Sequence, residues 1–433
     1  MKILIMKKNN KNNIKKQFPI FKQKINGNPL IYLDSAATTQ KPQDVIDCIE
    51  DYYSKYNSNI HRSAHQLARK ATEKWIEAHE IIADFLNAKS YKEIIFLRNC
   101  TEGINLFVNT YGKQNLKKGD YVIISEMEHH SNIVPWQILQ KEIDFNIEYI
   151  PINSEYRLDL DWLKKRADEL KDKLKIISVV HISNVLGTVN DIKEITSIAH
   201  SVGAVSLVDA AQSVARLKID VQNIDCDALV FSGHKIYGPT GSGAIYVKEK
   251  ILEKMPPYMG GGEMIREVHK DSFSLNELPW RYEAGTPNIA DGIALGEAIE
   301  WFNKTVTDLG GYERLVEHEK SLINRFLSNF EEMEWFKLFG SKERLGVITF
   351  NIDGFSFSGC KKGTVESNKY GEEIINFLSS KGLCIRDGFH CAQPLHERFD
   401  KGPTLRVSLG IYSDEADIDR AVKLIKEGVL RVM

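Results

Sequence analysis

Residues 227–243 read Asp-Ala-Leu-Val-Phe-Ser-Gly-His-Lys-Ile-Tyr-Gly-Pro-Thr-Gly-Ser-Gly. The four apolar residues from Ala228 to Phe231 predict a short buried strand that ends in small and polar residues. Ligands of open α/β sheets bind where such strands end. Lys235 follows this strand at once, and a lysine that loses part of its hydration there becomes a nucleophilic amine. The alternative is an ordinary surface lysine in a turn. The residues elsewhere in the chain distinguish between these two interpretations of Lys235.

Other apolar runs end in polar residues in the same way, at 93–97, 121–124, 175–181 and 204–209. Helical patterns, such as the one over 191–201, separate these predicted strands. This alternation is typical of a mainly parallel, doubly wound sheet. We therefore expect the polar residues at the strand ends to lie along one edge of the sheet, where a ligand binds.

The last third of the chain predicts a smaller α+β unit. Strands are expected over 346–351, 382–386 and 404–408, with helices over 371–380 and 414–429. A chain of 433 residues is also too long for one compact core. We expect three parts, which are a flexible basic tail (1–17), a large domain whose first segment packs on the small domain (18–300), and the small domain (301–433).

Composition narrows the class of protein. With 42% hydrophobic and 27% charged residues and a net charge of −2, the chain has the profile of a soluble globular protein with no preference for nucleic acid or an anionic membrane. No apolar run is long enough to span a bilayer. The six cysteines are scattered without CxxC pairs, which argues against a disulfide framework or a metal cluster. We expect a reducing compartment, the cytoplasm.

Three residues at strand ends carry chemistry of their own. Thr101 suits a helix N-cap, where free N–H groups attract a phosphate, although such a cap often holds no ligand. His129 can lie flat on an aromatic ring and move protons near neutral pH. Asp209 comes straight off its strand, where an acidic residue is otherwise a helix cap. Asp209 followed by Lys235, each on its own strand, is a more specific signal than either alone.

The loop 386–394 adds a reactive thiol. Cys391 has a histidine and an arginine beside it, surroundings that lower the pKa of a thiol. An inert buried thiol, which suits Cys226, fits Cys391 poorly because glycine and proline flank it in the loop. In the strand that follows, the planar guanidinium of Arg406 can bind a carboxylate through two hydrogen bonds. The alternative is a solvated charge at the edge of the sheet.

Together these motifs resemble the group II (Suf-type) cysteine desulfurases, a branch of the class V family of pyridoxal-phosphate (PLP) enzymes. The resemblance covers about residue 18 to the C-terminus. It rests on the lysine segment 227–243, the opening motif 31–42, the glycine run 260–262 and the loop 386–394. It implies the PLP-transferase fold of type I, an α/β fold. A large domain with a mainly parallel seven-stranded sheet precedes a smaller α+β C-terminal domain.

The resemblance also implies a role for each matching residue. Lys235 carries pyridoxal 5'-phosphate covalently, His129 stacks on its ring, and Cys391 is the nucleophile that becomes a persulfide. The further cofactor-binding residues it implies are Asp209 at the pyridine nitrogen, Gln212, Thr101, Ser232, His234, Asn184 and, reaching the neighbouring subunit, Thr286. The substrate-binding residues it implies are Arg406, Asn184, Arg386 and Ala36. It implies no metal.

The implied protein is a homodimer that converts L-cysteine to L-alanine. It passes the sulfur to an acceptor protein of the Suf system for iron–sulfur cluster assembly. Three alternatives stay open, namely a selenocysteine lyase acting on L-selenocysteine, a class V aminotransferase or kynureninase-like enzyme, and a sulfur-carrier scaffold without turnover. Cys391 weighs against the second. The set of His129, Asp209 and Lys235 weighs against the third.

The chain departs from the family pattern at four places. Ser63-Ala64 replaces the usual Gly-Ile, Asn99-Cys100 replaces the usual Gly-Thr, and the nucleophile loop carries Asp387 and Phe389. A polar insertion over 355–369, which contains Cys360, stands where the family has a short link with a histidine. The identity of the sulfur acceptor is therefore open.

Overall fold

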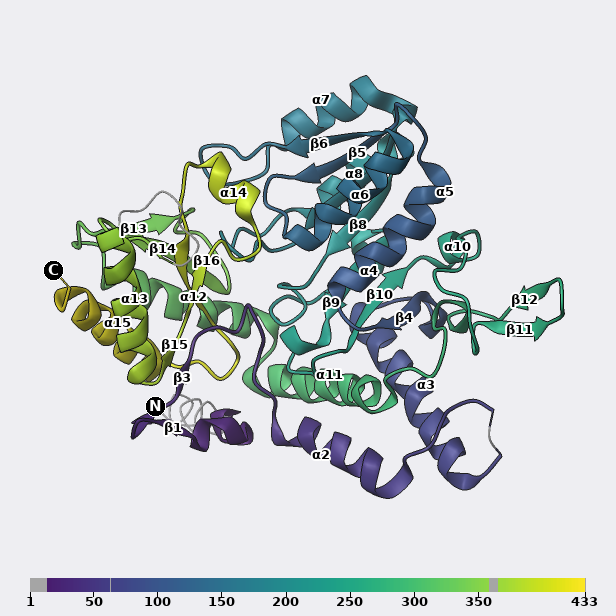
Figure 1. Ribbon diagram of the computed structural model, residues 1–433, viewed down its shortest axis with the longest axis horizontal. Coiled ribbons are helices and arrows are strands. Elements are labelled where there is room, and N and C mark those ends of the chain that lie inside the picture. The colour runs from purple at the N-terminus through teal and green to yellow at the C-terminus, as the bar shows by residue number, and fades with distance from the viewer. Residues whose placement is uncertain (1–13, 63, 358–364, 433) are drawn as a thin grey trace.

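Figure 1 shows a computed structural model of the chain, which describes residues 14–62, 64–357 and 365–432. Residues 1–13 of the expected tail lie outside this description. So do residues 358–364 of the insertion, among them Cys360.

A seven-stranded sheet forms the larger part, as expected. Its strand order is β4-β10-β9-β8-β7-β5-β6, and only β10 runs antiparallel to its neighbours. The strands, in that order, are Ile94–Leu97, Gly243–Val247, Ala228–Ser232, Val205–Asp209, Leu174–Val180, Tyr121–Ser125 and Asn146–Ile150. The central strands are almost wholly buried, which explains why they read as continuous apolar runs rather than as alternating ones.

Helices pack on this sheet and beside it. Among them, α4 contacts β9 and β10, and α8 contacts β7 and β8. The helices of this part are α2 (Gln43–Asp51), α3 (Gln66–Leu86), α4 (Cys100–Phe107), α5 (Lys113–Asn115), α6 (Val134–Ile143), α7 (Leu160–Leu170), α8 (Ile192–Ser201), α9 (Val221–Ile224), α10 (Glu249–Leu252) and α11 (Ile289–Leu309). None of the helices in the described residues is long and apolar enough to cross a membrane.

The two longest of these helices, α3 and α11, pack closely because of one glycine. A Cβ atom at Gly292 in α11 would lie 2.2 Å from the Trp75 ring of α3. Since real Cβ contacts are never this short, only glycine lets the two helices approach to this distance.

A four-stranded antiparallel sheet, β13-β14-β17-β16, forms the smaller part (Figure 1). Its strands are Phe336–Phe339, Val347–Ile352, Thr404–Ser408 and Arg386–Gly388, accompanied by helices α12 (Tyr312–Ser328), α13 (Val365–Ser380), α14 (Gln393–Arg398) and α15 (Glu415–Leu430). The N-terminal segment joins this part, because β3 (Ile31–Tyr32) pairs in parallel with β15 (Leu383–Cys384). The boundary expected after residue 300 falls inside α11.

The end of the expected tail is held in place. Ile14 is buried, Lys15 forms an ion pair with Asp417 at 2.5 Å, and Gln17 accepts a hydrogen bond from the Trp301 indole at 2.7 Å. The prediction of a flexible tail is therefore wrong for residues 14–17. The partners lie almost 300 or more positions away in the sequence, so local composition gave no sign of them.

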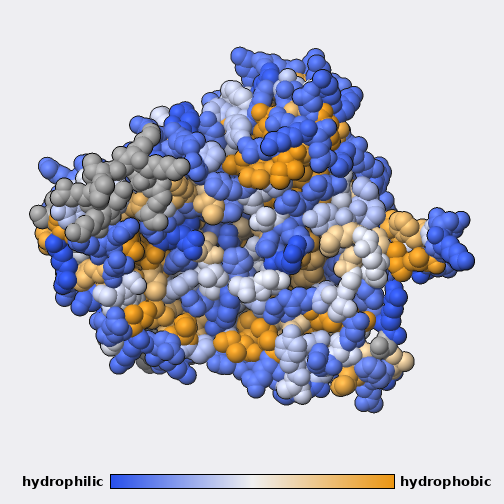
Figure 2. Space-filling model, in the orientation of Figure 1, coloured by the Kyte–Doolittle hydropathy of each residue, from blue (hydrophilic) through white to orange (hydrophobic). Residues whose placement is uncertain are grey.

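A short hairpin projects from the larger part (Figure 1). It consists of β11 (Ile265–Val268) and β12 (Phe273–Leu275), which follow the glycine run 260–262. Val268 and Phe273 are 63% and 59% exposed, and Figure 2 shows apolar surface along the hairpin behind a hydrophilic tip. Exposed apolar side chains on a projecting element are typical of a protein contact surface.

A buried ion pair links the two parts. Arg216 and Glu319 lie 3.4 Å apart, with side chains only 6% and 5% exposed. The guanidinium also donates to the carbonyls of Gln212 and Leu409, at 2.8 and 3.0 Å. Burial raises the pKa of Glu319, and the neighbouring Arg216 opposes that rise.

We expect Arg216→Ala to destabilise the protein by about 3–5 kcal/mol, because it leaves the Glu319 carboxylate buried without its partner. The double variant Arg216→Met/Glu319→Leu should recover most of the loss, since neither buried charge remains. Denaturant unfolding measures both. Arg325→Ala, which breaks the exposed Arg325–Asp419 pair between α12 and α15, is the control and should change little. Equal losses for Arg216→Ala and Arg325→Ala would contradict this account.

Candidate active site

The carboxyl ends of the large sheet's strands border a cavity of about 280 Å³. The small sheet closes it from the other side with Arg386, Arg406 and the loop that carries Cys391. Twelve of the residues singled out in the sequence line this cavity, namely Ala36, Thr101, His129, Asn184, Asp209, Gln212, Ser232, His234, Lys235, Arg386, Cys391 and Arg406. Their convergence agrees with the expectation that ligands of such sheets bind at the strand ends.

Thr286 does not reach this cavity within the chain. It is exposed and lines a second cavity of about 400 Å³, together with residues such as Trp75 and Met259. A role for Thr286 at the first cavity therefore requires a second subunit.

Lys235 lies in the short helical turn that follows β9, beside the carboxylate that ends β8. Burial lowers the pKa of Lys235, and Asp209 partly opposes this effect. A lysine with a lowered pKa loses its proton, and so becomes a nucleophile, more readily than a solvated one. Asp209 is 3% exposed and accepts a hydrogen bond from the Ala211 N–H at 2.9 Å.

His129 presents one defined tautomer to the cavity. Its Nδ1 accepts the backbone N–H of Ser131 at 3.1 Å and contacts the Ser131 hydroxyl at 2.8 Å. Burial, with Lys235 nearby, lowers the pKa of His129 to about 3, so the ring is neutral. A neutral imidazole whose Nδ1 accepts carries its proton on Nε2, and His129 therefore offers an N–H donor.

The start of α4 differs from the prediction. Asn99, not Thr101, is the N-cap, because its side chain accepts the Glu102 N–H at 2.9 Å. Thr101 lies in the first turn of the helix and is exposed at the cavity. The Cys100 N–H is already used, since it donates to the Ser232 hydroxyl at 2.9 Å. The helix N-terminus still faces the cavity, as an anion site requires.

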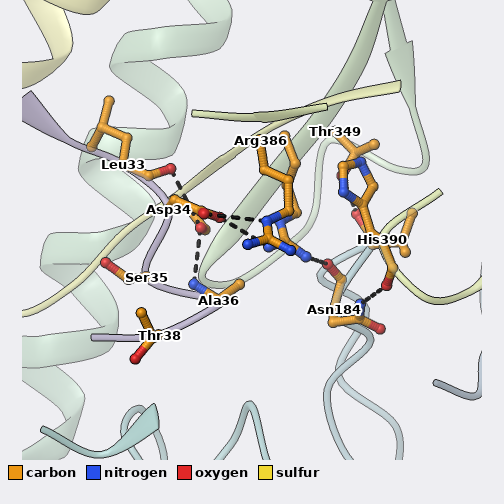
Figure 3. A network of polar contacts seen from close by, with 12 residues as sticks. Leu33, Asp34, Ser35, Ala36, Thr38, Asn184, Thr349, Arg386 and His390 are labelled. Carbon is orange, nitrogen blue, oxygen red and sulfur yellow. Dashed lines mark hydrogen bonds and ion pairs between the residues drawn. The ribbon is translucent and has the colours of Figure 1, made fainter. Parts of the chain in front are cut away.

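Two arginines share one carboxylate at the cavity wall (Figure 3). Arg386 and Arg406 are directly opposite each other on β16 and β17, and Asp34 contacts both, at 3.2 and 3.1 Å. Arg406 is 2% exposed, which excludes the alternative of a solvated edge charge. Its Nε has no partner, and burial lowers the pKa of its guanidinium to about 10. Two cations against one anion leave a net positive charge suited to a substrate carboxylate.

The backbone of Ala36 is already paired. Its N–H donates to the Ser408 hydroxyl at 2.9 Å, and its carbonyl accepts from the Gln212 amide, also at 2.9 Å. Ala36 therefore shapes the cavity wall, while its own hydrogen bonds hold β17 and the turn after β8 together. The Asn184 amide donates to the His390 carbonyl at 2.8 Å, and its Oδ1 is buried without a partner (Figure 3).

Sequence reasoning gave no role to Asp34, noted Cys100 only as a departure from the family pattern, and considered His390 only as a neighbour of Cys391. All three contact the site. The thiol of Cys100 donates to Asp209 Oδ1 at 3.3 Å, and burial raises its pKa so that it keeps its proton. Asp34 stands inside the opening motif, but its arginine partners are some 350 positions away. These contacts depend on the fold, and no local pattern predicts them.

His390 is a further cavity residue whose tautomer the structure fixes. Thr404 Oγ1 contacts His390 Nε2 at 2.9 Å and His396 Nε2 at 3.1 Å, and His396 Nδ1 contacts the Ala392 carbonyl at 3.0 Å. Because that carbonyl only accepts, a neutral His396 carries its proton on Nδ1 and takes the Thr404 hydroxyl proton at Nε2. His390 Nε2 then donates to Thr404, and its partnerless Nδ1 is an acceptor.

A scan of family models places residues 31–421 in the family described as aminotransferase class-V. The chain belongs to the class V aminotransferase family. A probable cysteine desulfurase of Halalkalibacterium halodurans is 42% identical over 414 residues, which cover 96% of this chain and 97% of that protein. A cysteine desulfurase of Escherichia coli strain K12 is 40% identical over 410 residues, 94% of this chain and 96% of its own.

Two solved structures share the fold over nearly the whole chain. The apo cysteine desulfurase of Thermococcus onnurineus NA1 matches with a TM-score of 0.87 and 31% identity, covering 97% of this chain and 98% of that one. The cysteine desulfurase CsdA of E. coli matches with a TM-score of 0.86 and 32% identity, covering 98% and 99%. The expected PLP-transferase fold is confirmed, and pyridoxal 5'-phosphate is the cofactor of this family.

The cavity residues fit this cofactor. A primary amine with a lowered pKa suits its aldehyde, and the buried carboxylate of Asp209 suits a pyridine nitrogen that carries a proton. The helix N-terminus at Thr101 suits its phosphate. Asn184 Oδ1, buried and without a partner, also needs a donor in the cavity.

His181, at the end of β7, gives the site an acid sensitivity that can be measured. Its N–H donates to the Asp209 carbonyl at 2.9 Å, and burial lowers the pKa of its ring to about 4. The unfolded chain therefore binds more protons at this residue between about pH 6.5 and pH 4. Stability contributed by neutral His181 is complete above this window and is lost as the pH falls through it.

We expect the stability advantage of the wild type over His181→Gln to shrink by roughly 2 kcal/mol between pH 7.5 and pH 5, because glutamine does not titrate. Denaturant unfolding of the cofactor-free proteins at both pH values measures the difference. His269→Gln, which changes an exposed histidine of the hairpin region, is the control and should follow the wild type at both values. A pH-independent difference between His181→Gln and the wild type would refute the prediction.

Proposed function

We propose that this protein is a cysteine desulfurase, which converts L-cysteine to L-alanine and keeps the sulfur as a persulfide on Cys391. One observation carries the proposal. An exposed thiol, Cys391, lines the same cavity as the lysine and the buried arginine that this chemistry needs, Lys235 and Arg406. The full-length relatives named as cysteine desulfurases support it.

The family resemblance indicates which residues would hold pyridoxal 5'-phosphate, and their chemistry fits these roles. Lys235 would bind its aldehyde carbon, Asp209 its ring nitrogen and His129 a ring face, and Gln212 and Asn184 would serve its hydroxyl. The group at its phosphate comprises Thr101, Ser232, His234 and, from a second subunit, Thr286. When bound, the cofactor supplies an electron sink that stabilises negative charge on the substrate's α-carbon.

The chain's own residues perform the remaining tasks. Arg406, with Asn184 and Arg386 nearby, binds the substrate carboxylate at the positively charged wall. Lys235 Nζ removes the proton from the α-carbon, and His129 holds a proton at Nε2 within the cavity. Cys391 Sγ attacks the sulfur of L-cysteine, so that an S–S bond forms as the substrate's C–S bond breaks.

We also propose the group II subtype, a homodimer and a sulfur acceptor of the Suf system. The glycine run 260–262 and the apolar hairpin after it support the subtype and the dimer, because the hairpin projects with Val268 and Phe273 exposed. We place the protein in the cytoplasm, since Cys48, Cys100, Cys226, Cys384 and Cys391 are all free thiols. We also propose that the chain divides into a large and a small domain near residue 300.

A selenocysteine lyase is the second candidate. The two reactions need the same carboxylate-binding arginine and the same lysine, and they differ in how far the protein's own thiol is required. The contribution of Cys391 therefore separates them.

We expect Cys391→Ala to abolish alanine and sulfide formation from L-cysteine, because the substrate sulfur then has no thiolate to attack it. Incubation of the purified holoenzyme with L-cysteine, followed by alanine and sulfide assays, measures this. Cys384→Ala, which removes a half-buried thiol nearby in sequence, is the control and should keep the wild-type rate.

The same assay with L-selenocysteine tests the alternative. Loss of both activities in Cys391→Ala supports the desulfurase, whereas loss of cysteine turnover with full selenocysteine turnover favours the lyase. Undiminished cysteine turnover by Cys391→Ala would remove the nucleophile from the proposal.

The dimer proposal predicts complementation between variants. Thr286→Ala should weaken cofactor binding about tenfold through the loss of one hydrogen bond to a charged group. Lys235→Ala should lose covalent attachment of the cofactor. Mixed dimers of the two should contain one site with wild-type cofactor affinity, since the Lys235→Ala subunit supplies Thr286 to its partner. Absorbance titration of the mixture with the cofactor measures this, and the absence of any site with wild-type affinity in the mixed dimer would place Thr286 in its own subunit's site.

A further inference from the structure

The nucleophile loop has a backbone conformation that its residues do not favour. His390 and Cys391 have φ angles of +50° and +56°, two consecutive non-glycine residues in the left-handed region. In this region the Cβ atom crowds the backbone, so such residues persist only where the surroundings hold them. The position of Cys391 at the cavity therefore depends on contacts that keep this loop in place.

Those contacts come from the ends of the large sheet's strands. The carbonyl of Cys391 accepts the N–H of His130 at 2.8 Å, and the carbonyl of His390 accepts the Asn184 amide at 2.8 Å. Beyond the cysteine, the N–H of Gln393 donates to His130 Nε2 at 3.0 Å. His130 thus contacts the loop on both sides, with its main chain at Cys391 and with its ring at Gln393.

The ring contact fixes the protonation of His130. A backbone N–H can only donate, so Nε2 carries a lone pair and the imidazole is neutral. Burial lowers the pKa of His130, which favours the same state. The neighbouring His129 faces the cavity, and the two adjacent histidines therefore have different tasks.

We propose that His130 is the positioning residue of the nucleophile. Its Nε2 holds the loop backbone at Gln393 and so keeps Cys391 turned to the cavity against the strain at His390 and Cys391. The task assigned to Cys391 rests on the proposed function, whereas the hold on the loop does not. In His130→Ala, the main-chain contact remains and the ring contact is lost.

The direct test is hydrogen exchange at the Gln393 amide, resolved by mass spectrometry with electron-transfer fragmentation, in the full-length cofactor-free protein. We expect His130→Ala to exchange about fivefold faster than the wild type, the factor that corresponds to one ordinary hydrogen bond. His130→Gln, whose side-chain oxygen can accept the same bond, should stay close to the wild type. This rescue separates the contact from a general loss of structure.

The functional readout is persulfide formation on Cys391 in a single turnover of the holoenzyme with L-cysteine. His130→Ala should slow this step about fivefold while cofactor affinity and KM stay unchanged, because the substrate and cofactor contacts are intact. Arg398→Ala is the matched control. It breaks the half-exposed contact of α14 with Glu126, at 3.2 Å, and should change neither readout.

Three results would overturn the proposal. The first is a wild-type exchange rate at the Gln393 amide in His130→Ala, and the second is a His130→Gln variant as defective as His130→Ala. The third is a loss of cofactor affinity in His130→Ala as large as its loss of persulfide formation, which would place the effect on His129. If the Gln393 amide exchanges faster in His130→Ala but the wild type forms no persulfide, the contact between His130 and the loop is supported. The proposed function is then refuted.

Discussion

The carboxylate of Asp34 between Arg386 and Arg406 is the interaction on which the site depends. Two guanidinium groups lie opposite each other on β16 and β17, and without a counter-charge they would repel, the more strongly because Arg406 is buried. Asp34 comes from the segment after β3, so the same contact fixes the N-terminal segment against the small sheet. One carboxylate thereby sets the cavity wall and leaves Arg406 Nε free for a substrate.

The parts of the fold that follow from local pattern were predictable. The buried strand before Lys235 and the strand before Asp209 are short apolar runs whose ends are fixed by small and polar residues, and both form as expected. Since parallel strands end at one edge, their order along the chain was enough to bring these two side chains together. The family match then confirmed the fold and the cofactor.

What escaped prediction depends on contacts between distant residues. Asn99 takes the N-cap because its side chain reaches the Glu102 N–H, whereas Thr101, which is also a capping residue by type, lies inside the first turn. Lys15 is held by Asp417, near the other end of the chain. The orientation of His390 depends on Thr404 and His396, which only the folded sheet places beside it. The secondary-structure propensities of single residues contain no information about these contacts between distant residues.

The path of the chain limits how the two sheets can move. Among the described residues it passes between them twice, once after β3 and once where α11 ends at Gly310 and Gly311, whose φ angles are +99° and +98°. Two crossings define an axis. We therefore expect any opening of the cavity to be a rotation about the line that joins these two crossings, and not a free separation of the two sheets.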